Sequence, residues 1–189
     1  GRERAEKIAR AAARLFSRKG YLETTMDGIA TSAKISKGGM YHYFKSKTEV
    51  LFFILTHYMD RVLDNLEDEV GQIEGAHEKL RFIISRHIAL YANHLNEAKV
   101  LLHEANCLPS KYFQIIAEKE RKYYHVVFQI LSGFLKNPVP KGQVKTITFM
   151  LFGMCNWIYA WYDPKGTVNP EELSEMICAV FLRGLEDFK

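Results

Sequence analysis

The stretch TTMDGIATSAKISKGGMYHYF, residues 24–44, decides the fold of the N-terminal part of this 189-residue chain. Thr24 or Thr25 can cap a short helix, because a hydroxyl oxygen accepts a hydrogen bond from the free amides of a first helical turn. Ser36 can cap a second short helix after a tight turn. The sequence therefore predicts two short helices at an angle to each other, a helix-turn-helix.

The second of these helices carries the side chains that we expect to meet DNA. It begins with SKGG, residues 36–39, whose small residues let the helix N-terminus approach a duplex while its backbone amides face phosphate. Tyr41 and His42 are expected to project from the same helix. A recognition helix of this kind indicates a sequence-specific DNA-binding protein.

Charge is divided unevenly along the chain. Residues 1–47 hold 11 Lys and Arg against 4 Asp and Glu, whereas residues 48–189 hold 15 against 18. A basic end beside a weakly acidic remainder indicates a polyanionic partner for the first part only. Double-stranded DNA is favoured over an anionic membrane surface, because the basic segment lacks a large apolar face beyond the one its own core needs.

The whole chain resembles the TetR family of transcriptional regulators. The residues that carry the resemblance stand in the family's order and spacing: Gly20-Tyr21, Thr24-Thr25-Met26, Ile29-Ala30, Ser36-Lys37-Gly38, Tyr41 and Phe44-Lys45-Ser46-Lys47. The resemblance implies a helix-turn-helix DNA-binding domain over residues 1–47 and a ligand-binding and dimerisation domain over residues 48–189. It also implies a ligand-responsive regulator, most often a repressor, that binds operator DNA as a homodimer.

The resemblance further implies a role for each matching position. Some positions correspond to phosphate contacts, which orient the protein, and others face the base edges in the groove, where sequence is read. The positions expected at the DNA interface are Thr25, Tyr41 and Lys47 at phosphates, Lys37, Gly39 and His42 toward the bases, and Ser36 and Gly38 at the start of the recognition helix.

Two further positions near the motif carry structural expectations. Phe44 is expected to lock the recognition helix onto the helix that begins at Lys47. Lys34 stands where the family often has Gly, and if the turn needs a positive φ there, a lysine costs about 1 kcal/mol.

The remainder of the chain is also predicted to be helical. Apolar residues recur at helical spacing, and no stretch shows sustained strand-like alternation. Ser46 and Glu49 form a capping box, so a long helix is expected from Lys47 to about Val70. The chain is thus expected to be all-α with about nine helices; those after the recognition helix are expected near 47–70, 77–95, 97–107, 110–136, 141–162 and 170–187.

The last two long helices are apolar on more than one face. Residues 146–162 carry no charge, but small and polar residues interrupt them, so a buried helix is expected there and no membrane partner. One face of each helix can pack on its own bundle and the other on a second copy. This predicts a homodimer through the last two helices, with a deeply buried monomer core as the alternative.

Aromatic and weakly polar residues indicate an effector pocket in the C-terminal part. His103 and Cys107 lie four residues apart and would suit a soft metal, so a metal-responsive regulator is one alternative, although no metal site or cofactor is predicted. A hydrogen-bonded core histidine is the commoner role. The positions expected to bind the ligand are His87, Tyr91, His94, His103, Asn106, Cys107, Tyr124, Phe128, Phe152 and Trp157.

The segment from Leu151 to Met176 is similar to the corresponding part of TetR-family regulators of fatty-acid, steroid and aromatic-acid degradation. Several of these respond to acyl-coenzyme A thioesters, so the resemblance implies a small hydrophobic effector or an acyl-CoA. A constitutive DNA-binding protein without a ligand is the alternative. Cations that suit the phosphates of the coenzyme are Arg81, Arg86, Arg121 and Lys122.

An enzyme is not expected, because the sequence has no GxSxG, no Gly-rich phosphate loop and no HExxH. Three widely spaced cysteines and the lack of a recognisable signal peptide lead us to expect a cytoplasmic protein with reduced thiols: Cys107, Cys155 and Cys178.

Overall fold

The computed structural model describes residues 1–135 and 139–186. Within these two ranges the regular elements are ten α-helices and two short 3₁₀ helices, with no strand. The all-α expectation is confirmed, and the expected number of helices agrees within one. The structure divides into two compact units: unit 1 comprises Gly1–Arg61 and His94–Lys119, and unit 2 comprises Val62–Asn93 and the chain from Glu120 onward.

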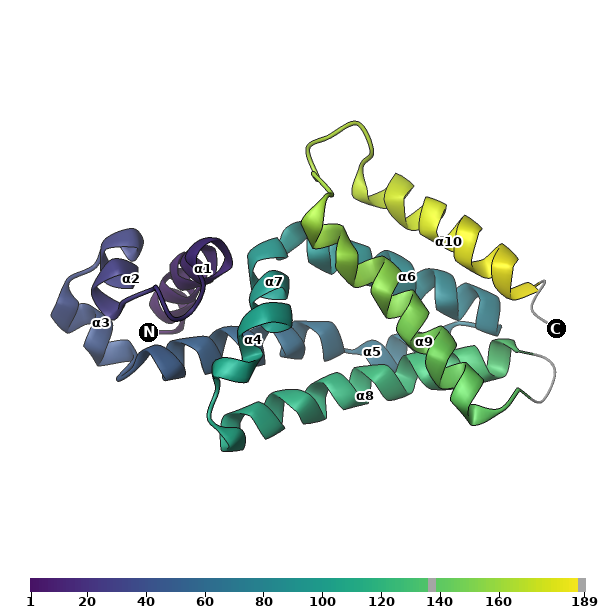
Figure 1. The fold of residues 1–189 in the computed structure, drawn as a ribbon, viewed down its shortest axis with the longest axis horizontal. Helices are drawn as coiled ribbons and strands as arrows, with labels where there is room; N and C mark the ends of the chain where they lie inside the picture. The colour runs from purple at the N-terminus through teal and green to yellow at the C-terminus, as the bar shows by residue number, and fades with distance from the viewer. Residues whose placement is uncertain (136–138, 187–189) are drawn as a thin grey trace. The chain divides into compact units, whose positions relative to one another are not determined.

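Unit 1 is built around α1, whose buried face consists largely of alanine. Small side chains let neighbouring helices approach closely, and α1 packs against both α2 and α7 (Figure 1). Ile8 and Phe16 supply the large buried side chains of α1. The helices of unit 1 are α1 (Arg2–Lys19), α2 (Met26–Ala33), α3 (Lys37–Tyr43), α4 (Lys47–Leu63) up to Arg61, α7 (Leu95–Glu104), the 3₁₀ helix η1 (Ala105–Cys107) and the first part of α8 (Ser110–Phe134).

The predicted helix from Lys47 to about Val70 is interrupted, so that expectation is wrong. The expected cap at its start is present, since Ser46 Oγ accepts from the amide of Glu49 at 3.2 Å. The Glu49 carboxylate in turn accepts from the amide of Lys45, one residue before Ser46, at 2.7 Å. However, α4 ends at Leu63 and α5 (Leu66–Gln72) follows Asn65, which has φ 49°. Asparagine enters the left-handed region more readily than most residues, which permits the break.

Unit 2 is a helical layer in which α10 packs along α6 and both contact α9 (Figure 1). The apolar residues of α10 lie at spacings of three and four and are buried, among them Leu173, Ile177 and Phe181. The elements of unit 2 are α5, α6 (Ala76–Asn93), α8 from Glu120, α9 (Lys141–Asn156), the 3₁₀ helix η2 (Trp157–Ala160) and α10 (Pro170–Glu186).

The helix expected over residues 141–162 is shorter than predicted. α9 ends at Asn156, and the chain continues as the 3₁₀ turn η2. The ends expected at residues 136 and 187, and the break expected from Asn137, lie outside the described residues. In the part of the chain that the structure describes, the apolar helices all fall short of what a membrane span requires.

Candidate nucleic-acid interface and effector region

The two short helices α2 and α3 begin in the same way. Thr25 Oγ1 accepts from the amide of Gly28, and Ser36 Oγ accepts from the amide of Gly39, both at 3.1 Å. A Cβ atom at Gly28 or Gly39 would lie only 3.2 or 3.1 Å from the capping oxygen, so glycine leaves room for each cap. The predicted caps are confirmed, with Thr25 rather than Thr24 as the first.

The turn between α2 and α3 requires a left-handed residue, and Lys34 supplies it. Its backbone has φ 56° and ψ 51°, and its amide donates to the carbonyl oxygen of Thr31 at 3.1 Å. The next amide, of Ile35, donates to Ala30 at 3.0 Å and closes the turn. This conformation costs a residue with a Cβ about 1 kcal/mol. The positive φ considered for Lys34, where the family often has Gly, is therefore present.

The inner side of α3 is anchored in the core while its outer side is open. Met40 is fully buried, and the ring of Phe44 lies 5.3 Å from that of Phe53 on α4. Phe44 therefore joins α3 to α4, as expected. The expected DNA-facing positions other than Lys47 lie on the outer side: Thr25, Ser36, Lys37, Gly38, Tyr41 and His42 are exposed, and Gly39 is half-buried.

Lys37 at the start of α3 is paired with an acidic residue of α2. Its Nζ lies 3.1 Å from Oδ2 of Asp27, and both side chains are exposed. The hydrogen bond and the charge of Asp27 raise the pKa of Lys37. Lys37 is therefore a permanent cation whose position is set by the preceding helix.

Lys47 occupies a different environment from the other DNA-facing candidates. Its Nζ donates to the carbonyl oxygens of Tyr21, Leu22 and Thr24 at 2.7, 3.2 and 2.7 Å. It also lies 4.4 Å from the centroid of the Tyr21 ring. The sequence offered no signal for these contacts, because every residue has a carbonyl group.

His87 lies at the centre of a buried polar and aromatic group in unit 2. The Tyr123 hydroxyl donates to Nδ1 of His87 at 2.9 Å, and Nε2–H donates to Oδ1 of Asn156 at 2.9 Å. The Tyr91 ring stacks on the imidazole at 5.3 Å, and the Phe152 ring is 6.3 Å away. Burial lowers the pKa of His87 to about 4, against the effect of Asn156, so the imidazole is neutral at pH 7.

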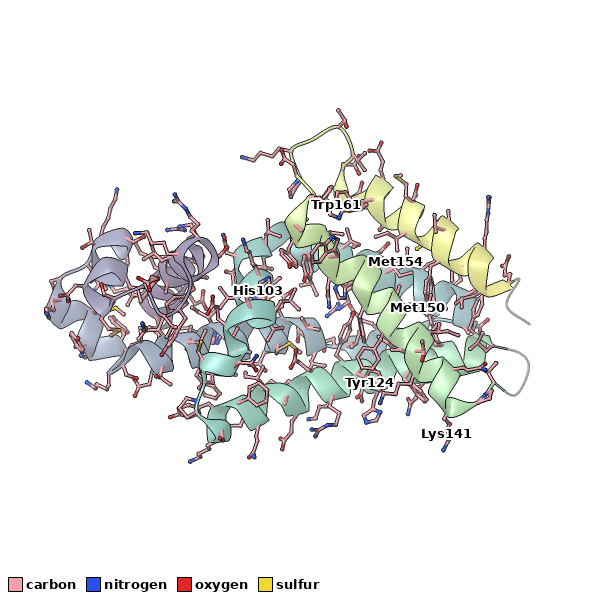
Figure 2. All side chains as sticks on the ribbon, viewed as in Figure 1. His103, Tyr124, Lys141, Met150, Met154 and Trp161 are labelled. Carbon is pink, nitrogen blue, oxygen red and sulfur yellow. The ribbon has the colours of Figure 1, made fainter. Side chains whose placement is uncertain are left out.

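A row of aromatic rings extends from this group to the surface of unit 2. The ring of Tyr124 lies 5.5 Å from Phe149, 5.8 Å from Phe128 and 6.4 Å from Phe152. Tyr124 is on α8 (Figure 2), and Phe149 on α9 is 55% exposed. Three of these rings are among the ligand positions expected from the sequence. Tyr123, Asn156 and Phe149 are not, because only their side-chain contacts identify them.

The other expected ligand positions are not gathered around His87. The helix expected over residues 77–95 ends at Asn93, so His94 leaves the face of His87 and becomes the N-cap residue of α7. Trp157 is 61% exposed. Among the described residues no group of three or more His, Cys, Asp and Glu side chains is placed to hold a metal ion. The remaining positions all lie in unit 1: His103 and Asn106 are exposed and Cys107 is half-buried.

Arg86, one of the cations expected to suit the phosphates of a coenzyme, already binds a carboxylate and a backbone carbonyl group. Arg86 Nη1 donates to Oε2 of Glu69 at 2.7 Å, and Nη2 donates to the carbonyl oxygen of Asp64 at 2.5 Å. Arg86 thereby joins α6 to the region around α5. Arg121 and Lys122 are exposed on α8, next to the tyrosines of the aromatic row.

Comparison with known proteins gives consistent matches over the chain. The model of bacterial regulatory proteins of the tetR family matches residues 8–52, and the model of the tetracyclin repressor-like C-terminal domain matches residues 74–185. The fatty acid metabolism regulator protein of Bacillus subtilis (strain 168) is 29% identical over 138 residues, which cover 73% of this chain and 69% of that protein.

Two solved structures share this fold and have comparable sequence identity. A TetR-family transcriptional regulator from Bordetella parapertussis 12822 has 29% identity and a TM-score of 0.90, with 94% of this chain and 93% of that chain covered. AibR in complex with isovaleryl coenzyme A and operator DNA has 28% identity and a TM-score of 0.81, with coverage of 94% and 97%. The C-terminal family model alone matches more than half of the chain. The chain therefore belongs to the TetR family, whose members are transcription regulators and not enzymes.

Proposed function

We propose that this protein is a homodimeric repressor that binds a pseudo-palindromic operator through α3 of each protomer and leaves the operator when a hydrophobic effector binds. The observation that carries the proposal is the capped α2–α3 pair, whose outer side exposes Lys37 and His42 above the buried Met40. The similarity to a fatty acid metabolism regulator protein, and to AibR in complex with isovaleryl coenzyme A and operator DNA, supports the proposal.

On the DNA, the exposed N-terminus of α3 lies in the major groove. Lys37 and His42 contact base edges, and Gly38 and Gly39 let the backbone approach the phosphates. Thr25 and Tyr41 contact phosphate on either side of the groove. We assign DNA binding to residues 1–47, and effector binding and dimerisation to residues 48–189.

Dimerisation uses apolar side chains that α9, η2 and α10 leave exposed. A row along α9, η2 and the residue after η2 repeats at spacings of four, three and four residues: Met150, Met154, Trp157 and Trp161. Such spacing is typical of a helix face in a four-helix contact. Figure 2 shows Met150, Met154 and Trp161 along this row. A monomer would leave these large side chains in water, which favours a second copy as their cover. The exposed apolar residues of the face are Met150, Trp157, Trp161, Met176 and Val180.

The effector site is the aromatic row of unit 2. An acyl chain packs against rings such as Tyr124 and the exposed Phe149, while the neutral His87 with Tyr123 supplies the polar end of the site. In an acyl-CoA, the phosphates meet the exposed Arg121 and Lys122 beside the row. A free hydrophobic molecule uses the rings alone.

Release of the operator requires a link between effector and DNA. A hundredfold release corresponds to about 2.7 kcal/mol of differential effector affinity for the two states. The chain passes between the two units at three places, and α4 is the connection that begins next to α3, at Lys47, and ends in unit 2, at Leu63. We take α4 as the path that the movement follows. Because linkage is reciprocal, operator DNA weakens effector binding by the same factor.

The test begins with selection of operator sequences from random DNA, followed by footprinting on the selected site. A symmetric footprint with two half-sites about one helical turn apart is expected. Short- to long-chain acyl-CoA thioesters and the corresponding free acids are then added. Loss of the footprint with one of these series supports a repressor with that effector. An asymmetric or absent footprint from folded protein contradicts the proposal, and a footprint that no compound changes leaves a constitutive DNA-binding protein.

A further inference from the structure

We propose that the side chain of Lys47 is a positioning residue, which holds the Tyr21–Thr24 loop in place for DNA binding instead of contacting a phosphate itself. The proposal rests on the proposed DNA-binding function and assigns a role within the same interface. It starts from the three carbonyl oxygens that surround Nζ in the structure.

The geometry uses the full donor capacity of the ammonium group. A lysine ammonium has three N–H donors, and here three backbone carbonyl oxygens lie 2.7 to 3.2 Å from Nζ. The ring of Tyr21 lies against the same cation, with its centroid 4.4 Å from Nζ. A phosphate oxygen can accept a hydrogen bond from this ammonium only if one of the three bonds to carbonyl oxygens is broken.

Other contacts hold the same loop to the start of α4. The Tyr21 hydroxyl shares a hydrogen bond with Thr48 Oγ1 at 3.1 Å, and the Tyr21 ring packs 5.3 Å from that of Phe16 on α1. Thr24 Oγ1 donates to the carbonyl oxygen of Gly20 at 2.8 Å. Tyr21 and Thr24 are both buried, so the two ends of the loop are held in the domain core. Lys47 is the side chain that donates to the carbonyl oxygens of Tyr21, Leu22 and Thr24 between these ends.

The loop leads directly into the residue that caps α2. Thr24 is followed by Thr25, whose hydroxyl caps α2 and which is exposed toward the proposed DNA surface. Without Lys47, three carbonyl dipoles would converge without a cation beside an approaching polyanion. Lys47 thus fixes the position of Thr25 and offsets the negative ends of the three carbonyl dipoles. Its contribution to DNA binding comes from these two effects and not from a contact with phosphate.

Arginine and methionine at position 47 separate the two roles. A guanidinium binds phosphate at least as well as an ammonium does, but its planar fork cannot place three donors on carbonyls that surround a single nitrogen. Lys47→Arg is therefore a good replacement for a phosphate contact and a poor one for a loop anchor. Lys47→Met keeps much of the length of the side chain and removes both functions. Lys7→Met, at an exposed position of α1, is the control for the loss of one charge.

We expect Lys47→Arg and Lys47→Met each to weaken operator binding by about tenfold or more while the slope of log K against log salt stays as in the wild type. Circular dichroism checks that both variants fold, and hydrogen exchange should show faster exchange for the amides of residues 21–28 only. Lys7→Met should weaken binding by about twofold or less. An arginine variant that binds like the wild type, together with a methionine variant whose slope falls by about 0.9 per protomer, would overturn the proposal.

A measurement on the wild-type protein avoids dependence on the variants. The ¹⁵N resonance of the Lys47 ammonium should be visible at neutral pH because its protons are held by carbonyl oxygens, and it should keep its chemical shift when operator is added. A signal that is absent from the free protein and appears with operator indicates a phosphate contact and rejects the anchoring role. If the wild-type protein binds no operator at all, the proposed function fails, whereas the free-protein resonance still reports on the anchor.

Discussion

Asp27 near the start of α2 binds the ammonium of Lys37 at the start of α3, with 3.1 Å between Oδ2 and Nζ. The pair joins the two helices of the motif across their exposed side. It also places a carboxylate beside a cation that is proposed to read bases. Since exposed ion pairs add little to stability, we expect the consequence of this pair to lie in DNA binding.

Replacing Asp27 with Asn should tighten binding to operator and to scrambled DNA alike, by about fivefold at low salt, because a charge that repels phosphate is removed and Lys37 is released. Fluorescence anisotropy with both duplexes measures the two affinities. Asp68→Asn, at an exposed position of α5, is the matched control and should leave both affinities unchanged. Weaker operator binding by Asp27→Asn would mean that the ion pair orients Lys37 for its contact.

Replacing His42 with Ala should change which bases are preferred at the positions it contacts, since His42 projects from the exposed side of α3. Discrimination at one base pair should fall by about 1–3 kcal/mol. Selection from a random DNA library, followed by sequencing, gives the preferred motif for the wild type and the variant. An unchanged motif from His42→Ala would remove this residue from base reading.

Replacing Lys34 with Gly should increase the free energy of unfolding by about 0.5–1 kcal/mol, because glycine adopts the left-handed conformation at φ 56° without a Cβ clash. Urea denaturation at constant m value measures the change. Lys34→Ala removes the same charge but keeps the clash, so its stability should stay near that of the wild type. If Lys34→Gly and Lys34→Ala increased the free energy of unfolding equally, the loss of the lysine charge would be the cause.

Burial of neutral His87 should make stability depend on pH between about 4 and 6.5. Its folded-state pKa of about 4 lies below the ordinary 6.5, so below pH 6.5 the unfolded chain binds a proton that the folded chain does not. The stability contribution is therefore full above pH 6.5 and falls by about 3 kcal/mol as the pH approaches 4. Urea titrations across this range should give a shallower decline for His87→Gln than for the wild type.

His125→Gln, at an exposed position of the neighbouring helix α8, is the control for the His87 experiment. Its unfolding free energy should follow the wild-type curve. Parallel curves for wild type and His87→Gln would show that other groups cause the decline and that His87 is not held neutral by burial.

A charge on the exposed face of α10 should dissociate the proposed dimer. Val180 is 67% exposed in the isolated chain, so Val180→Glu should fold normally but bury an unpaired carboxylate at the interface, at a cost of several kcal/mol. Sedimentation velocity measures the fraction of dimer. Leu102→Glu, at an exposed apolar position of α7, is the matched control and should remain dimeric. Wild-type protein that sediments as a monomer would contradict the interface itself.

Local chemistry made much of the α2–α3 pair predictable from the sequence. The caps at Thr25, Ser36 and Ser46 depend on residues only three positions apart, so the pattern of residue types is enough. The left-handed turn at Lys34 was suggested only by the resemblance to the TetR family, which often has Gly at this position, because lysine itself gives no signal for a positive φ. The break at Asn65 was missed because residues 47–70 contain no Gly or Pro, and the weaker signal of an asparagine, which favours helix ends, was passed over.

Tertiary structure alone decided the partners of Lys47 and His87. The acceptors around Lys47 lie 23 to 26 residues earlier in the chain, and they are carbonyl groups, which every residue carries. Tyr123 and Asn156 meet His87 from helices 36 and 69 residues away. Helical spacing shows which side chains share a face, but it contains no information on which face another helix will cover. For that reason the sequence by itself determined the all-α fold and the caps of α2 and α3, whereas packing between distant helices decided which polar groups are buried together.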